Sequence, residues 1–144
     1  MVLVTRIKRI EKVSCAHRLH SATLSADEDR EIFGKCNNEF GHDHNYTFEA
    51  TIKGPVHPQT GMVINIAILK VLMQKVLDQV DHKFIDREVP DFTTIPSKAE
   101  NIAAWFYAEL STELSVVKTT DDAWELEVVT VFETDKNIAS VSNE

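Results

Sequence analysis

Residues 42–53, with the sequence HDHNYTFEATIK, carry the clearest structural pattern in the chain. Two sets of residues alternate along this segment: His42, His44, Tyr46, Phe48, Ala50 and Ile52 in one, and Asp43, Asn45, Thr47, Glu49, Thr51 and Lys53 in the other. Successive side chains of a strand point to opposite faces, so this period of two predicts a half-buried strand. Gly54-Pro55 should end it.

Two elements are predicted before this strand. Residues 2–17 carry Val, Ile and Thr among charged residues, which predicts a loosely alternating strand. Ser25-Ala26-Asp27-Glu28 has the form of a capping box and Gly34 is typical of a helix C-terminus, so a short helix is predicted over 26–33. A loop should follow from Lys35 to Gly41.

The middle of the chain predicts a brief strand and a helix. Residues 62–64 are apolar and follow a turn, which favours a short strand. Asn65 can cap a helix that ends near Asp81 and whose apolar face comprises Leu69, Leu72, Met73, Val76 and Val80. The two prolines within 86–96 indicate a loop.

The last part of the chain predicts one more helix and two strands. Ser97-Lys98-Ala99-Glu100 resembles a second capping box, opening a helix with Ile102, Trp105, Phe106 and Leu110 inward. After a turn at 118–122, the residues Trp124, Leu126, Val128, Thr130 and Phe132 alternate with a second set, and 138–141 forms a final strand. The order ββααββ predicts an α+β fold, an antiparallel four-stranded sheet with two helices packed on one face.

Composition limits the function. With 144 residues, 43% hydrophobic and 26% charged, the chain fits a single domain over 1–144. A net charge of −8 disfavours a nucleic-acid or anionic-membrane binder. The N-terminal residues lack a long apolar run, so we expect no signal peptide or membrane span and a cytoplasmic protein whose cysteines stay reduced.

The histidines indicate a metal site. His42 and His44 are two residues apart, so on a strand both imidazoles point to the same side. His17 could supply a third ligand if its strand pairs beside 42–53. Three histidines without a firm fourth protein ligand are typical of a catalytic zinc, which keeps one coordination position open. Further candidate ligands are His20, His57 and Asp43.

The two cysteines leave alternatives open. Cys15 shares the parity of His17, so it could approach the same metal or pack as a small hydrophobic residue. Cys36 follows Lys35 and precedes His42 by six residues, where a cation and a metal could produce a thiolate base. An inert loop cysteine fits the same position.

Several strings together resemble the 6-pyruvoyl-tetrahydropterin synthase family. Residues 36–46, CNNEFGHDHNY, resemble its signature, and residues 16–21, AHRLHS, resemble its first zinc-ligand motif. Five shorter strings follow in the family's order and spacing: Phe33-Gly34-Lys35, Thr60-Gly61-Met62-Val63, Asp81-His82-Lys83, Glu100-Asn101 and Glu133-Thr134-Asp135. The resemblance therefore covers nearly the whole chain, although Lys98 and Ala99 stand where the family usually has threonines and Cys15 replaces a smaller residue.

The resemblance implies a role for each matching residue. The zinc (Zn2+) ligands would be His17, His42 and His44; the catalytic residues Cys36, Asp81 and His82; and the pterin-binding residues Glu133 and Glu100. Each could also be structural: Glu133 as a solvated strand end, Glu100 within the capping box, and Asp81 and His82 as polar residues at a helix end.

The resemblance also implies an activity and an assembly. The family is a group of lyases that convert 7,8-dihydroneopterin triphosphate into 6-pyruvoyl-tetrahydropterin, releasing triphosphate, in tetrahydrobiopterin biosynthesis. Its members have the tunnelling fold, in which three subunits join their sheets into a barrel. Two such rings stack into a homohexamer with active sites between subunits.

Three other functions fit parts of the sequence. A cupin-like iron oxygenase would use His42, His44 and Glu49, but Glu49 has the opposite parity. A non-catalytic zinc-binding or pterin-binding relative would not need the proposed catalytic residues. A 6-carboxytetrahydropterin synthase usually has its cysteine fewer residues before the histidine pair than Cys36 is here.

Two basic groups could bind the triphosphate. Arg18, Lys35 and Lys83 adjoin predicted site residues. The densest basic stretch is instead Arg6, Lys8, Arg9 and Lys12. The sequence alone leaves both open.

Overall fold

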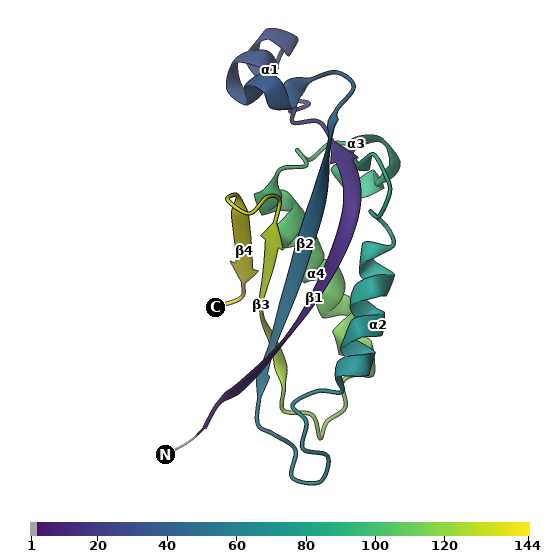
Figure 1. Ribbon diagram of the computed structural model, residues 1–144, viewed down its shortest axis with the longest axis vertical. Helices are drawn as coiled ribbons and strands as arrows, with labels where there is room; N and C mark the ends of the chain where they lie inside the picture. Colours follow the sequence, from purple (N-terminus) through teal and green to yellow (C-terminus); the bar gives the residue numbers. More distant parts are fainter. Residues whose placement is uncertain (1–2) are drawn as a thin grey trace.

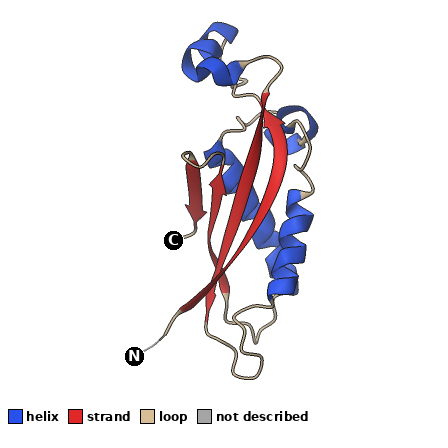
Figure 2. Cartoon of the chain, viewed as in Figure 1, coloured by secondary structure: helices blue, strands red, loops and turns tan. Residues whose placement is uncertain are grey.

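The computed structural model describes residues 3–144. Its main feature is an antiparallel sheet with the strand order β1-β2-β3-β4, covered on one face by two long helices (Figure 1, Figure 2). The elements of this layer pair are β1 (Thr5–His17), β2 (His42–Gly54), β3 (Glu125–Phe132), β4 (Ile138–Ser142), α2 (Ile66–Leu77) and α4 (Ala99–Val117). The predicted α+β fold with the order ββααββ is confirmed; Val2, placed in the first predicted strand, lies outside the described residues.

Strand β2 forms as its alternation predicts. The side chains of Tyr46, Phe48, Ala50 and Ile52 are all buried beneath the helices. The ring of Phe48 packs edge-on against that of Phe106 in α4, with the centroids 5.0 Å apart. Because each large apolar side chain buried in this way contributes roughly 1.5–3 kcal/mol, this face of β2 anchors the sheet to the helices.

A short helix projects beyond one end of the sheet. In α1 (Ala26–Phe33) the Ser25 hydroxyl accepts from the Glu28 amide and the Glu28 carboxylate accepts from the Ser25 amide, which confirms the first capping box. Figure 1 shows α1 past the end of β1 and the start of β2. The predicted loop after it begins with a 3-10 turn, η1 (Gly34–Asn37).

Two predictions for the middle of the chain, a strand and a loop, are wrong. Residues 62–64 form no strand, because 57–62 close a turn on themselves, with the His57 amide donating to the Met62 carbonyl. The segment 86–96 contains α3 (Ile85–Glu88) and η2 (Pro90–Phe92), since a proline is tolerated in the first turn of a helix.

Helix α2 ends at Leu77, earlier than the predicted Asp81. The chain leaves the helical path because its next residues bond to β1. The Asp81 carboxylate accepts from the Ser14 amide at 3.1 Å, and the His82 amide donates to the Ser14 carbonyl at 2.6 Å. This segment therefore follows the outer edge of β1.

The second predicted capping box is also wrong. Helix α4 has Lys98 as its N-cap, without a side-chain capping bond. The Ser97 hydroxyl instead donates to the Asp86 carboxylate at 2.6 Å. The inward face of α4 is as predicted, and none of the helices within residues 3–144 is long and apolar enough to cross a membrane.

A β-bulge in β3 changes which face its residues occupy. Thr51 lies opposite Val128 but Ile52 lies opposite Leu126, so Glu127 is the extra residue. Beyond the bulge Val129 and Val131 are buried, whereas the sequence placed Val128, Thr130 and Phe132 on the face of Trp124 and Leu126. The parity switch turns the end of β3, and Glu133 after it, toward the helix-covered face.

Candidate metal centre and active site

The three predicted histidine ligands meet where β1 and β2 pair. His17 lies directly opposite His42, and His44 follows two residues along β2 on the same face. One ring nitrogen of each lies within 4.8 Å of the others. The Nε2 atoms of His17 and His42 are 2.8 Å apart. This spacing allows one ion to contact all three rings.

His17 is the most firmly held of these ligands. Its ring is fully buried, and Nδ1 lies 2.7 Å from the Ser97 carbonyl oxygen. A carbonyl only accepts, so Nδ1 carries the proton and Nε2 presents its lone pair to the cluster. Burial, chiefly, lowers the pKa of His17 to about 4, which keeps the ring neutral.

His42 and His44 are also held in the neutral form. Burial lowers the pKa of both, and for His42 the neighbouring His44 adds to the effect. The Nε2 atom of His44 is buried without a hydrogen-bond partner. A buried polar atom left unpaired is costly, and a cation bound to the lone pair would relieve that cost. Neutral imidazoles suit zinc, so the donor set fits the predicted metal.

The two cysteines have different surroundings. Cys15 is buried, and burial, chiefly, raises its pKa to about 12, so it packs as a neutral thiol. It does not join the three histidines in the candidate metal cluster found in residues 3–144. Cys36 lies in η1, where its carbonyl accepts from the Leu19 amide at 2.7 Å, two residues beyond His17. The structure thus brings Cys36 alongside the segment that carries a metal ligand.

Of the two predicted pterin-binding carboxylates, Glu133 lies against the histidines, and the exposed Glu100 is close enough to act on it. Glu133 Oε1 lies 3.4 Å from His44 Nε2, without forming a hydrogen bond. Burial raises the pKa of Glu133, with a smaller contribution from the charge of Glu100 and an opposing one from His42. Both carboxylates therefore act on the same small region. The β3 bulge explains how Glu133 comes to this face.

Asp81 and His82 form a pair away from that cluster, on the outer edge of β1. Asp81 Oδ1 lies 3.0 Å from His82 Nδ1 and also accepts from the Ser14 amide. His82 adopts a positive φ of 59°, and its side chain is 81% exposed. A non-glycine residue in this conformation is uncommon and is typical of functional sites. The two backbone bonds to Ser14 hold the pair in place.

The other predicted candidates have local structural roles. His20 Nδ1 contacts the Arg18 carbonyl, and His57 accepts bonds from the turn that follows it. Asp43 lies on the opposite face of β2, as does Glu49, which pairs with Lys8 at 3.3 Å. A cupin-like metal set using Glu49 is therefore excluded.

Sequence reasoning missed the groups that hold His17 in position. The carboxylate of Asp86 accepts from both the Ser97 hydroxyl and the Arg18 amide, and the Tyr46 hydroxyl lies 3.1 Å from His17 Nδ1. Tyr46 could have been found, because it continues the parity of His42 and His44. Asp86 and Ser97 carry no such signal, since only the fold brings them to His17.

Gly41 has a specific role beside the metal ligands. It adopts a φ of 75°, and a Cβ atom there would lie 2.5 Å from the Phe84 ring. Any other residue would displace Phe84 or the start of β2. The glycine before His42 is therefore required by close packing.

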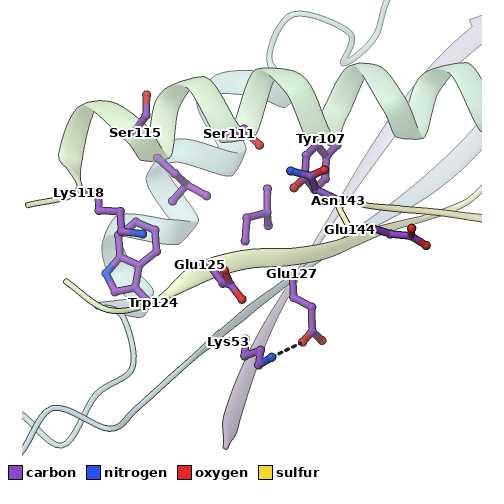
Figure 3. A pocket seen from close by; sticks show the side chains of 12 residues that line it. Lys53, Tyr107, Ser111, Ser115, Lys118, Trp124, Glu125, Glu127, Asn143 and Glu144 are labelled. Carbon is purple, nitrogen blue, oxygen red and sulfur yellow. Dashed lines mark ion pairs between the residues drawn. The ribbon is translucent and has the colours of Figure 1, made fainter.

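A separate hollow of about 580 Å³ lies between α4 and β3 (Figure 3). It is lined by residues such as Tyr107, Trp124 and Glu127, and Lys53, which also lines it, forms an ion pair with Glu127. None of the predicted site residues lines it. The chemistry indicated by the sequence therefore belongs to the histidine cluster.

The four-stranded sheet, its two covering helices and a histidine cluster that could hold a metal ion define an α+β protein with the tunnelling fold. The family model described as 6-pyruvoyl tetrahydropterin synthase matches residues 6–144. The chain belongs to this family.

Similar proteins agree with the family assignment. The chain is 44% identical to a putative 6-pyruvoyl tetrahydrobiopterin synthase of Caenorhabditis elegans, covering 96% of this chain and 94% of that one. It is 40% identical to the Homo sapiens 6-pyruvoyl tetrahydrobiopterin synthase, covering 96% and 92%. The solved Caenorhabditis elegans 6-pyruvoyl tetrahydropterin synthase superposes with a TM-score of 0.89 at 41% identity, covering 99% and 97%.

Proposed function

We propose that this protein is a 6-pyruvoyl-tetrahydropterin synthase that uses zinc to convert 7,8-dihydroneopterin triphosphate into 6-pyruvoyl-tetrahydropterin with release of triphosphate. The observation that carries the proposal is the arrangement of three neutral imidazoles beside a half-buried carboxylate, Glu133. This arrangement lies in a chain that is similar over nearly its whole length to enzymes named for this product.

His17, His42 and His44 would hold the zinc. When bound, the ion supplies Lewis-acid polarisation of the substrate's side-chain hydroxyls, which makes the neighbouring carbon-bound protons easier to remove. Cys15 packs as a neutral thiol, so the three histidines would leave a coordination position of the zinc for the substrate.

Glu133 would anchor the pterin ring. A carboxylate that faces the guanidine-like edge of a pterin can accept two parallel charge-assisted hydrogen bonds. Such a pair fixes the orientation of the ring and thereby directs its side chain toward the histidines. Glu100, whose charge acts on Glu133, would contact the same edge.

Cys36 would act as the base that removes the carbon-bound proton, since a thiolate is the reactive form of cysteine. Asp81 would fix the orientation and tautomer of the His82 ring and stabilise its protonated form. The exposed ring could then pass a proton to or from the reacting side chain. The ring reduction is internal to the substrate, so no external redox cofactor is required.

The open edges of the sheet support a barrel of several chains. The even-numbered residues of β1 direct their amides outward, as Ser14 and Ala16 show by bonding to 81–83. Within residues 3–144, the outward-facing amides of the even-numbered residues from 6 to 12 have no such backbone partner. An uncovered edge favours pairing with another strand, and β4 leaves a second such edge. We propose a homohexamer in which the neighbour completes the site around His82.

The proline variant Ile10→Pro tests this assembly. It would remove an outward-facing amide without breaking a bond inside the chain. We expect the variant to elute as a smaller species in size-exclusion chromatography while still binding zinc. Ile10→Ala, which keeps the amide, is the control, and an unchanged assembly in the proline variant would contradict the proposal.

Turnover tests the function directly. Purified protein is incubated with 7,8-dihydroneopterin triphosphate before and after chelation, and the products and zinc content are measured. We expect release of triphosphate that stops on chelation and returns with zinc. A protein that binds zinc and pterin but forms no product would be a non-catalytic relative. The cytoplasm, where the Cys36 thiol would stay reduced, is the compartment we propose.

A further inference from the structure

A basic pocket lies at the end of the sheet where α1 projects. Its volume is about 760 Å³, and the charged residues that line it are Arg18, Arg30, Lys35 and Glu39. Three cations against one carboxylate stand out in a chain whose net charge is −8. A pocket of this charge favours an anionic ligand.

The pocket adjoins the proposed active site through the backbone. Arg18 directly follows His17, and Lys35 directly precedes Cys36. The amide of Leu19 donates to the Cys36 carbonyl at 2.7 Å, which ties the two segments together. A ligand in the pocket would therefore lie next to both a metal ligand and the proposed base.

The cations of the pocket are available to a ligand. Arg18 Nε donates to the Asn37 carbonyl at 3.0 Å, and this bond holds the guanidinium in place. The terminal nitrogens of the guanidinium make only a longer contact with the Asn37 side chain, so they can donate to a ligand. Arg30 pairs only with the exposed Asp27 among the residues that the structure describes. Across residues 3–144, Lys35 makes no ion pair.

Three of the four cations of the alternative basic stretch are already paired, and the fourth, Lys12, lines a hollow whose other charged residues are Glu11, Asp78 and Asp81. Arg6 pairs with Glu127, Lys8 with Glu49, and Arg9 with Glu11, each of them within the sheet. Lys83 does not line the pocket. The structure thus favours Arg18 and Lys35 over the basic stretch of β1 as the site that binds the triphosphate.

The order of chemical groups along the site matches the order of groups in the proposed substrate. Glu133 follows Phe132, which lies opposite Thr47, whereas Arg18 follows His17, which lies opposite His42. The two residues are therefore at opposite ends of the histidine cluster along β2. A pterin held by Glu133, with its hydroxyls at the histidines, would extend its phosphates toward the pocket.

We propose that the pocket lined by Arg18, Arg30 and Lys35 binds the triphosphate tail of the substrate and, after the reaction, the released triphosphate. This inference rests on the proposed function. Arg18 presents a planar set of donors suited to phosphate oxygens, and Lys35 and Arg30 add charge at the wall of the pocket.

Binding of inorganic tripolyphosphate tests the pocket without any turnover. Calorimetric titration is carried out on the zinc-loaded protein and on the variants Arg30→Gln and Lys35→Gln. We expect one binding site per chain and a loss of affinity of about tenfold for each cation removed, as for a hydrogen bond to a charged group. Lys70→Gln, which removes an exposed cation from α2, should leave the affinity unchanged.

Two further measurements separate this inference from the proposed function. 7,8-Dihydroneopterin, which lacks the phosphates, should bind Arg30→Gln as tightly as the unaltered protein. In turnover, Arg30→Gln should raise KM about tenfold with little change in kcat, because the lost contact is equal in ground and transition states. Tripolyphosphate binding that is absent, or that is insensitive to both variants, would overturn the pocket assignment. A protein that binds tripolyphosphate there but does not convert the pterin would overturn only the proposed function.

Discussion

The histidine cluster is enclosed within one chain, whereas the Asp81–His82 pair is exposed at its surface. The cluster is formed by paired residues of adjacent strands, and His17 has no exposed surface. The pair lies on the outer edge of β1, with His82 81% exposed. One chain therefore contains all three proposed metal ligands, whereas the proposed proton relay faces outward, where a neighbouring chain would meet it. Metal binding and catalysis should accordingly respond differently to mutation.

The largest effect is expected from His42→Ala. The variant removes one of the three proposed metal ligands from the cluster, so zinc should be lost and turnover should become undetectable. Metal analysis after gel filtration and a product assay measure the two losses. His57→Ala, in an exposed turn, is the matched control. Stoichiometric zinc in His42→Ala would remove this residue from the ligand set.

A smaller effect on turnover, with the metal kept, is expected from Cys36→Ala. A general base contributes about 10²- to 10⁴-fold, so kcat should fall within this range. Zinc content and the circular dichroism spectrum should stay unchanged, since Cys36 is outside the cluster. Cys15→Ala is the control for a cysteine that only packs. Near-normal turnover by Cys36→Ala would exclude it from the mechanism.

Asp81→Asn should reduce kcat less, by about tenfold to a hundredfold, the range typical of a group that orients a functional imidazole. The amide oxygen can still accept from the Ser14 amide, but the His82 ring loses its carboxylate partner. Zinc content is expected to be unaffected, because the pair is not part of the cluster. Asp78→Asn, at the exposed end of α2, is the matched control. An unchanged kcat would leave Asp81 with only its structural bond to Ser14.

The alternation of β2 made much of this predictable. A period of two fixes which side chains share a face, so His42, His44 and Tyr46 could be placed together from the sequence. The capping box at Ser25 was equally local. In both cases the interacting residues are close in sequence, and the prediction needed no knowledge of the fold.

The features that could not be predicted depend on contacts between distant segments. The bulge that turns Glu133 toward the histidines arises from the pairing of β2 with β3. The residues around Glu127 carry no sequence pattern that predicts it. Ser97 matched a capping pattern, yet its hydroxyl is taken by Asp86. The early end of α2 follows from the bonds of Asp81 and His82 to Ser14, which is far from both in the sequence.

The burial of His17 predicts a pH effect confined to the histidine cluster. Its pKa is about 4 in the folded chain and 6.5 when exposed. Between these values the unfolded chain binds more protons, so the metal-free protein loses stability as the pH falls from 6.5 toward 4. At pH 5 the loss from this residue is about 2 kcal/mol, from a difference of roughly 1.5 pH units.

Urea unfolding of the chelated protein at pH 7.5 and pH 5 measures this loss. Carboxylates also respond to acid, and His17→Gln isolates the histidine because glutamine does not titrate in this range. The difference in unfolding free energy between the two pH values should be about 2 kcal/mol smaller in the variant. Equal pH dependence in the unaltered protein and in His17→Gln would mean that the His17 ring accepts a proton without an energetic penalty. That result would contradict the comparison between a buried histidine cluster and an exposed Asp81–His82 pair.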